Sequence, residues 1–197
     1  MWNSTIQYKK KAFIVMSGPS GAGKSTLIRE ILSLYGSKAM TTTVSYTTRP
    51  PRGEEQEGRD YHFVSKEQFL AFKERHFFAE WACVYNYYYA TAVEQIEKCW
   101  AEGKAIIKDL DLQGADQIKK KYPQALRVFI APPSVEELVH RVRKRKENSK
   151  EELEVRKEQA LKEMEYGNHF EHYLANVDLQ ETIKKLKKVI DEYLKVV

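Results

Sequence analysis

The sequence predicts an α/β fold, in which a parallel sheet is flanked by helices. Short apolar runs of strand length alternate with stretches of helical period along the chain. A chain of 197 residues has room for one such domain, and no Gly/Ser/Pro-rich linker divides it. We therefore expect a single unit with a substantial buried core.

The elements of this core follow from the apolar pattern. Strands are expected at residues 12–16, 105–107 and 126–130, and helices at residues 26–35, 113–121 and 135–145. Because a helix follows each strand, the strands should run parallel. Near the end, Ile183, Leu186, Ile190 and Leu194 recur at spacings of three and four, which predicts a closing amphipathic helix.

Two segments interrupt the alternation. Residues 41–91 are rich in Thr and Tyr and contain a turn-prone RPPRG run and a short helical stretch at 66–75, so we interpret them as an inserted subdomain. More than half of residues 136–167 are charged, and their sparse apolar side chains predict a helical lid with little stability of its own. The core then comprises about residues 10–40, 92–135 and 168–197.

Composition limits the function classes. With 42% apolar and 12% aromatic residues the chain is not intrinsically disordered, and a formal net charge of +5 fits acidic small ligands at least as well as nucleic acid. The two cysteines cannot form a disulfide framework, which favours a reducing compartment. Residues 1–11 lack the apolar core of a signal peptide, and no apolar run reaches the roughly 18 residues of a membrane span. We expect a soluble, cytoplasmic protein.

The strongest motif is GPSGAGKST at residues 18–26, which fits G-x-x-x-x-G-K-[ST] between a predicted strand and a predicted helix. Its backbone N–H groups and the helix N-terminus would bind phosphate, Lys24 would reach the β and γ phosphates, and Ser25 would hold Mg²⁺. The alternative is a glycine-rich turn with an ordinary exposed lysine. The predicted ATP-binding residues here are Gly18, Ser20, Gly21, Ala22, Gly23, Lys24, Ser25 and Thr26.

Phosphate binding alone does not name the reaction, because motors, switches and kinases share such a loop. In these enzymes an acidic residue after an apolar strand contacts the metal shell, and either Asp109 or Asp111 fits. Two carboxylates two positions apart on a strand share a face, so both would look into one cleft. The alternative is a solvated strand end. Lys108 is an unusual member of this strand.

Several further segments carry a family resemblance. They are SYTTRPPR at 45–52, FAEWA at 78–82, DLDLQG at 109–114, IAPPS at 130–134 and NVDL at 176–179. With the phosphate loop, they make the chain resemble the guanylate kinase family of P-loop nucleoside monophosphate kinases over nearly its whole length. The resemblance implies a P-loop NTPase core, a GMP-binding insertion and a lid. It also implies a cytoplasmic transferase of purine nucleotide metabolism that converts ATP and GMP, and dGMP as well, into diphosphates with Mg²⁺ by direct in-line transfer.

The resemblance also implies the acceptor site. Arg49 and Arg52 would bind the 5′-phosphate of GMP, and the carboxylate of Glu80 would accept the N1–H and N2 amino protons of guanine, which adenine lacks. From the residues alone, the alternative for Arg49 and Arg52 is an exposed basic loop. The alternative for Glu80 is a surface acid beside Trp81. The implied GMP-binding set is Ser45, Arg49, Arg52, Tyr61, Glu80, Tyr89, Thr91 and Asp111.

Phosphoryl transfer needs positive charge around the transferring group more than it needs a nucleophilic side chain. The resemblance implies a catalytic set of Lys24, Arg49, Arg141, Arg145 and Arg156, and a metal site at Ser25 and Asp109. A solvated basic helix is the alternative for the three later arginines. Asn176 is implied near the adenine of ATP, although a turn-forming role is nearly as good an interpretation.

Some positions depart from the family pattern. Ala90 stands where a glycine is usual. If the family's backbone needs a positive φ there, alanine would adopt it only with strain, and Tyr89 and Thr91 would be displaced. Lys108 stands where an apolar residue is usual. The competing hypotheses are a guanylate-kinase-like interaction module without catalysis and a kinase for another monophosphate such as IMP. The expected partners are the small molecules ATP and GMP, with no nucleic acid and no membrane, and the expected state is a monomer or homodimer.

Overall fold

The computed structural model describes residues 11–84, 86–134, 136–137 and 150–197. Its larger sheet has five strands in the order β2 (Met40–Thr41), β7 (Ala105–Asp109), β1 (Phe13–Ser17), β8 (Leu126–Ala131) and β9 (His172–Ala175). Every neighbouring pair in this sheet is parallel. The predicted α/β class, with a parallel sheet flanked by helices, is therefore confirmed.

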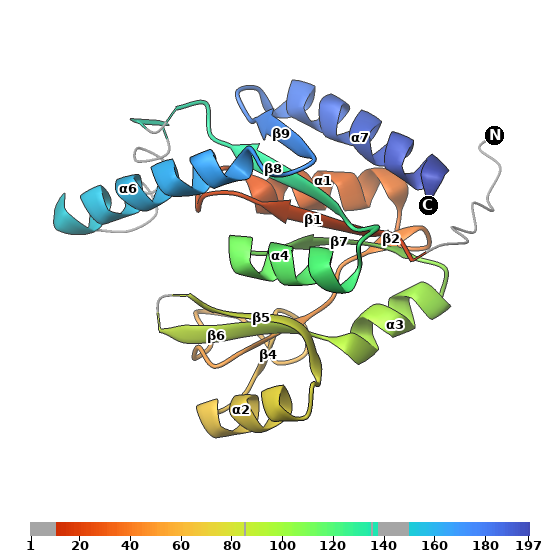
Figure 1. Cartoon of the computed structure of the whole chain (residues 1–197), viewed down its shortest axis with the longest axis vertical. Coiled ribbons are helices and arrows are strands. Elements are labelled where there is room, and N and C mark those ends of the chain that lie inside the picture. Colours follow the sequence, from red (N-terminus) through yellow and green to blue (C-terminus); the bar gives the residue numbers. More distant parts are fainter. Residues whose placement is uncertain (1–10, 85, 135, 138–149) are drawn as a thin grey trace.

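Helices cover both faces of this sheet (Figure 1). α1 (Lys24–Tyr35) and α7 (Leu179–Val196) pack on one face, and α3 (Val93–Ala101) and α4 (Leu112–Lys121) pack on the other. The central strand β1 is buried throughout, and its side chains alternate between the two layers: Ile14 faces α1 and α7, whereas Phe13 and Val15 face α3 and α4. Such a strand reads as a continuous apolar run, which is why the sequence reveals it.

A second sheet of four strands lies beyond α4 (Figure 1). Its order is β4 (Tyr61–Phe63), β3 (Ser45–Thr47), β6 (Tyr87–Ala92) and β5 (Phe78–Val84). The pair β3–β4 is parallel and the other pairs are antiparallel. α2 (Lys66–Glu74) covers this sheet with the fully buried Phe69, and a capping box of Ser65 and Gln68 starts the helix.

The two sheets are tied together by a side chain of α4. The amide group of Gln117 donates to the carbonyl of Trp81 at 2.7 Å, and its oxygen accepts from the backbone N–H of Trp81 at 3.2 Å. A side chain of the core thus bonds both backbone groups of Trp81 on the edge strand β5, which holds the second sheet against the core.

The departure at position 90 causes no backbone strain. Ala90 lies in β6 between Tyr46 and Trp81, is buried, and does not have a positive φ. Among the described residues, the non-glycine positions with positive φ are His76 and Asn86, and asparagine tolerates this conformation at the turn between β5 and β6. Tyr89 and Thr91 therefore remain in register with β5.

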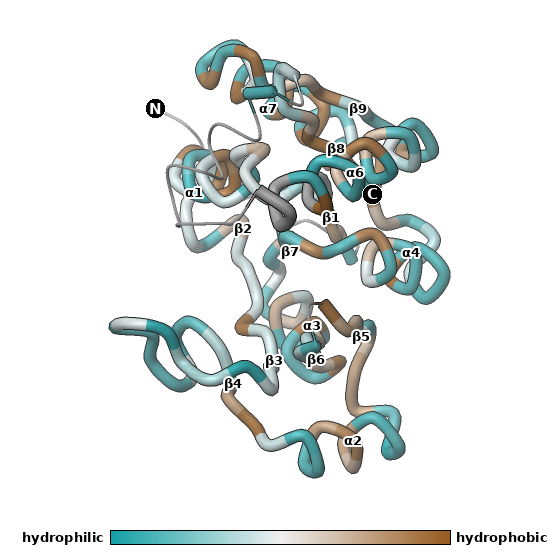
Figure 2. Tube along the Cα trace, turned by 90° about the vertical axis from the view of Figure 1, so that its left-hand side faces the viewer, coloured by the Kyte–Doolittle hydropathy of each residue, from teal (hydrophilic) through white to brown (hydrophobic). Residues whose placement is uncertain are grey.

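The segment predicted as a lid is described in part. The predicted helix at 135–145 falls almost wholly outside the described residues, whereas α6 (Lys150–Gly167) is a helix of 18 residues. α6 ends at Gly167, where an added Cβ would lie 2.5 Å from the ring of Phe129. Figure 2 shows the hydrophilic loop that joins β3 to β4 beside the second sheet. Within the described ranges, no helix combines the length and apolar character that a bilayer crossing requires.

Candidate active site

The loop at residues 18–23 turns the chain from β1 into α1, and its glycines are required by close contacts. Gly18 has φ 138°, and a Cβ there would run into the backbone of Ile130 in the neighbouring strand β8. Gly23 is the N-cap of α1 in the left-handed conformation. The loop therefore presents backbone rather than side chains to whatever approaches it.

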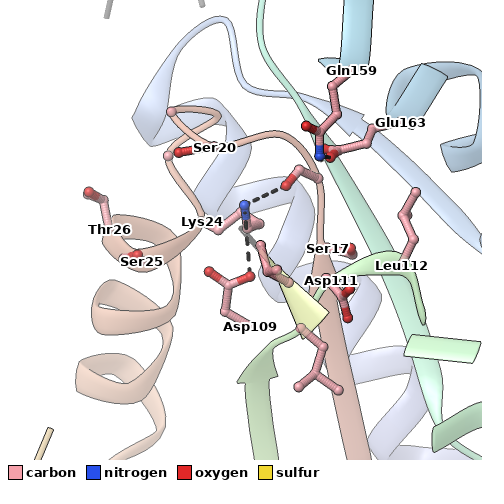
Figure 3. A pocket seen from close by; sticks show the side chains of 15 residues that line it. Ser17, Ser20, Lys24, Ser25, Thr26, Asp109, Asp111, Leu112, Gln159 and Glu163 are labelled. Atoms are coloured by element: carbon pink, nitrogen blue, oxygen red, sulfur yellow. Dashed lines mark hydrogen bonds and ion pairs between the residues drawn. The ribbon is translucent and has the colours of Figure 1, made fainter. Parts of the chain in front are cut away.

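Lys24 begins α1 and is held inside the mouth of the loop. Its Nζ atom donates to the carbonyl of Gly18 at 2.5 Å and to that of Pro19 at 3.1 Å, and lies 3.8 Å from Oδ1 of Asp109 (Figure 3). Only 11% of the side chain is exposed. The ammonium group is thus fixed beside the N-terminus of α1, where both attract an anion.

A cavity of about 300 Å³ opens in front of this lysine. Its walls come from the phosphate loop, from the segment after β7, from Val84 at the end of β5, and from α6. The predicted ATP-binding residues that line it are Gly18, Ser20, Gly21, Gly23, Lys24, Ser25 and Thr26. Ala22 instead packs in the core below the loop.

Asn176 supports the loop from behind. Its side-chain amide is buried and donates to the carbonyl of Ala22 at 2.8 Å, and its backbone N–H bonds to Ala131 at the end of β8. The residues that line the described cavity do not include Asn176. The contact observed for this residue is therefore with the loop that would hold the phosphates.

The two predicted carboxylates share one wall of the cavity. Asp109 ends β7 and faces Lys24, whereas Asp111 is the N-cap of α4 and accepts from the N–H of Gly114 at 2.8 Å. Both side chains line the cavity, although they do not share a strand face as the sequence predicted, because β7 ends at Asp109 and Asp111 already belongs to the start of α4. Desolvation raises the pKa of Asp111, although the bond from Gly114 opposes this shift.

The donors fit a magnesium ion that is shared with phosphates. Within the described ranges, no group of three or more His, Cys, Asp or Glu side chains could hold a metal by itself. Ser25 and Asp109 offer one hydroxyl and one carboxylate at the same cavity. Mg²⁺ commonly takes one or two protein oxygens and completes its shell with water and phosphate oxygens, so this pair suits it.

Two residues that line the cavity were not predicted from the sequence. Gln159 and Glu163 reach the cavity from α6, and the amide of Gln159 donates to Glu163 at 2.9 Å (Figure 3). Desolvation raises the pKa of Glu163, whereas the charge of Lys24 lowers it. Their spacing of four residues on one helix face was a signal, but it is hidden among the many other charges of this segment.

The predicted phosphate clamp for GMP is partly assembled. Arg49 is buried and donates to the carbonyl of Pro50 at 2.7 Å and to Oε1 of Glu55 at 2.9 Å. Its guanidinium lies 5.2 Å from the ring centre of Tyr61, which in turn lies 6.1 Å from the ring centre of Tyr89. The hydrogen bond between Arg49 and Glu55 raises the pKa of Arg49 and lowers that of Glu55.

The second arginine of the clamp is turned to solvent. Arg52 has an exposed side chain, and its backbone N–H donates to the other carboxylate oxygen of Glu55 at 2.8 Å. Glu55 therefore accepts hydrogen bonds from both arginine residues, from the side chain of Arg49 and from the backbone N–H of Arg52. Ser45 lies on β3, where it pairs with Tyr61 of β4.

The predicted base-reading acid is buried, which excludes the surface-acid alternative. Glu80 on β5 is 4% exposed and accepts a hydrogen bond from the hydroxyl of Thr91 at 2.5 Å. Burial raises the pKa of Glu80 to about 7. Its Oε2 lies close above Gly114 of α4, so the DLQG segment contacts both Glu80 and the cavity of the phosphate loop.

The remaining predicted residues belong to the segment predicted as a lid. Arg141 and Arg145 lie outside the described residues, and Arg156 belongs to α6 with a side chain that is not among those described. The convergence of these arginines on the cavity therefore stays a prediction.

Comparisons with known proteins agree with the resemblance seen in the motifs. A family model described as guanylate kinase matches residues 10–193. A guanylate kinase of Wolinella succinogenes is 42% identical, covering 93% of this chain and 85% of its own length. One of Caldanaerobacter subterraneus is 38% identical, covering 92% and 87%. The crystal structure of guanylate kinase from Anaplasma phagocytophilum superimposes with a TM-score of 0.73 at 26% identity, covering 92% of this chain and 85% of that one.

Proposed function

The chain belongs to the guanylate kinase family, and from that premise we propose that it transfers the γ-phosphoryl group of ATP to GMP, which yields ADP and GDP. One observation carries the proposal at the level of the site. The segment from Asp109 to Gly114 faces Lys24 of the phosphate loop at one end and the buried Glu80 at the other. A donor phosphate and an acceptor base would thus bind on either side of one short segment.

Glu80 selects the base in this proposal. Guanine offers N1–H and the N2 amino group as donors, and a carboxylate accepts both, with Asp111 as a further acceptor. Adenine presents a lone pair at N1, so the same carboxylate would lose its partners at a cost of about 1–3 kcal/mol for each unpaired group. The hydroxyl of Ser45 would donate to O6 of guanine. The hydroxyl of Thr91 has a single donor, which is bonded to Glu80, so it would donate to O6 only by giving up that bond.

The phosphate of GMP would bind at Arg49, Arg52, Tyr61 and Tyr89. Arg49 is bonded to Glu55, so phosphate binding exchanges one anionic partner for another. Because the guanidinium is buried and stacked on Tyr61, its direction is set before GMP arrives. Preorganised positive charge of this kind favours the transition state of phosphoryl transfer, in which negative charge spreads over the moving group.

On the donor side, Lys24 and the backbone of the loop would hold the phosphates of ATP. Mg²⁺ would be held by Ser25 and Asp109 together with the nucleotide, and when bound it neutralises charge on the phosphate oxygens. Asn176 would act on this side of the site by holding the carbonyl of Ala22. Lid residues Arg141, Arg145 and Arg156 would add charge as the lid closes.

The wider assignments belong to the same proposal. The chain would divide into a core at about 10–40, 92–135 and 168–197, a GMP-binding insertion at about 41–91 and a lid at about 136–167. We expect a monomer or homodimer that acts in the cytoplasm on small nucleotides, dGMP included, without a nucleic acid or membrane partner. The free cysteines Cys83 and Cys99 suit a reducing compartment.

Product analysis tests this function. Purified protein is mixed with Mg-ATP and GMP, and the nucleotides are separated by anion-exchange chromatography at successive times. We expect ADP and GDP to appear in equal amounts. ADP without GDP would indicate hydrolysis rather than transfer, and the absence of both products would contradict the proposal.

A further inference from the structure

α4 lies between the two sheets and directs one side at β5 (Figure 1). Asp111, Gly114 and Gln117 are three positions apart, so they share that side of the helix. Gly114 lies against the carboxylate of Glu80, and Gln117 bonds the backbone of Trp81, the next residue of β5. The first turn of the same helix lines the cavity of the phosphate loop. α4 therefore contacts both the proposed donor site and the strand that carries Glu80.

The amide group of Gln117 is bonded on all sides. Its Nε2 atom carries two donors, and it donates to the carbonyl of Trp81 at 2.7 Å and to that of Gln113 at 3.3 Å. Its Oε1 atom accepts from the backbone N–H of Trp81 at 3.2 Å. The bond to Gln113 holds the side chain on its own helix. The two bonds to Trp81 fix the direction of β5 as well as its distance, because hydrogen bonds weaken steeply when they are misaligned.

The apolar contacts between α4 and β5 are less specific. Ala79 of β5 belongs to the same buried cluster as Ala115 and Ile118 of α4. Apolar attraction has no preferred direction, so small side chains of this kind would let the strand slide or rotate on the helix. Gln117 adds directional bonds to this contact, and it thereby sets the register between the smaller sheet and the core.

Most of the residues proposed to bind GMP move with the smaller sheet. They lie on its strands and in the connection between β3 and β4: Ser45, Arg49, Arg52, Tyr61, Glu80, Tyr89 and Thr91. The bond from Thr91 to Glu80 is made within this sheet and does not depend on α4. A small displacement of the sheet on α4 would therefore carry bound GMP with it. It would leave most contacts with GMP intact and would move the acceptor phosphate relative to Lys24.

We propose that Gln117 is a positioning residue for phosphoryl transfer, which fixes the smaller sheet where the acceptor oxygen of GMP lies in line with the transferred phosphate of ATP. The inference rests on the proposed function. In-line transfer depends on alignment, and a displacement of about 1 Å caused far from the chemistry can cost about a hundredfold in rate. Gln117 acts through the backbone of Trp81 rather than by contact with either nucleotide.

Two other roles for Gln117 make different predictions. If it only stabilised the fold, its loss would reduce the number of folded molecules, and the rate per binding site would not change. If it oriented the neighbouring Glu80, its loss would weaken GMP binding and the preference for GMP over AMP. A residue that positions the whole sheet affects the rate per site and leaves the affinity and the preference unchanged.

The test uses Gln117→Met, which keeps the length and helix propensity of the side chain and removes its bonds to Trp81 and Gln113. Titration calorimetry with GMP gives the number of binding sites and the Kd, and initial rates with saturating Mg-ATP and GMP then give kcat per site. We expect kcat per site to fall by at least about tenfold. The Kd values for GMP and Mg-ATP and the preference for GMP over AMP in kcat/KM should each stay within about twofold.

Two further variants accompany this one. Gln124→Met makes the same chemical change at an exposed position beyond the end of α4, where it removes a bond to the carbonyl of Lys11, and should behave as wild type. Gln117→Glu keeps the acceptor for the N–H of Trp81 and places a carboxylate against its carbonyl, so kcat per site should again fall by at least about tenfold. Gln117→Glu takes the place of Gln117→Met if the latter does not fold.

Two results would overturn the inference. One is a kcat per site within about twofold of wild type in the folded Gln117 variants, and the other is a Kd for GMP that rises beyond that factor. The second result would show that Gln117 acts on the base site instead. The failure of the proposed function is distinguishable, because it would appear as no GDP formation by the wild-type protein. Normal GDP formation by wild type and by the Gln117 variants alike would contradict only the role of Gln117.

Discussion

Glu80 and Thr91 face each other across β5 and β6, and the hydroxyl of Thr91 donates to the carboxylate of Glu80 at 2.5 Å. This bond uses one carboxylate oxygen and fixes the direction of the other. Oε2 of Glu80 lies above Gly114, where a side chain would not fit. The carboxylate of Glu80 is thus oriented by a strand on one side and by the start of a helix on the other.

The first prediction concerns pH. Burial raises the pKa of Glu80 to about 7, and the proposed contact with guanine needs the ionised carboxylate, so GMP binding should strengthen as the pH rises through this value. Below it, the KM for GMP should increase by about tenfold for each pH unit. Glu80→Gln should lose this component and retain only the titration of the GMP phosphate. Identical pH profiles for the two proteins would show that Glu80 does not titrate in the base site.

The second prediction concerns Gly114. A Cβ at this position would lie 2.6 Å from Oε2 of Glu80 and 3.1 Å from Oδ1 of Asp111, so Gly114→Ala must displace the end of one of these side chains. The helix itself should tolerate alanine, which favours helices by about 1 kcal/mol over glycine. We expect an intact fold by circular dichroism and a KM for GMP raised by about tenfold, the size of one lost charged hydrogen bond. The exposed neighbour Gln113→Ala is the control, and equal KM values for the two variants would contradict the placement of Glu80.

The third prediction concerns the support of the phosphate loop. Asn176→Ala removes the buried amide that donates to Ala22, which leaves that carbonyl without this bond and frees space behind Gly23. The cost should be about 1–3 kcal/mol in unfolding free energy, with a rise in the KM for ATP and little change in that for GMP. Val177→Ala changes an adjacent side chain that is 70% exposed and serves as the control. A raised KM for GMP alone would refute the assignment of Asn176 to the donor side.

The fourth prediction concerns Lys24. The backbone of the loop folds around its glycines and does not require the lysine, so Lys24→Ala should unfold at nearly the wild-type temperature. Its turnover should fall by at least about a hundredfold, because a preorganised charge at the transferring phosphate is lost. Arg29→Ala, on the exposed face of the same helix, controls for removal of a positive charge. Turnover within about twofold of wild type in Lys24→Ala would mean that the loop has been misassigned.

The sequence predicted the features that follow from local pattern. The apolar runs of β1, β7 and β8 and the glycine spacing of residues 18–26 each depend on neighbours within a few positions, and each lies where the pattern indicated. The predicted strand at 105–107 extends to Asp109, since Lys108 continues the pairing with β1. A lysine at that position carries no local signal of its burial.

Long-range contacts account for what the pattern did not reveal. Lys108 donates to the carbonyl of Thr43, which is 65 positions away, and Asn176 donates to that of Ala22, which is 154 positions away. Gln159 and Glu163 lie among many other polar and charged residues, so the sequence does not single them out. Only the packing of α6 over the cavity distinguishes them from their neighbours. A positive φ at Ala90 was expected because a glycine is usual at this position in the family. Ala90 does not adopt it, because β6 is extended at this residue.

Glu80 is proposed to make GMP rather than AMP the phosphate acceptor. The most direct test compares kcat/KM for GMP and AMP with the same protein and saturating Mg-ATP. Two unpaired groups at about 1–3 kcal/mol each correspond to a preference of at least about thirtyfold for GMP, and we predict a ratio above that value. Equal kcat/KM for the two nucleotides would contradict the account.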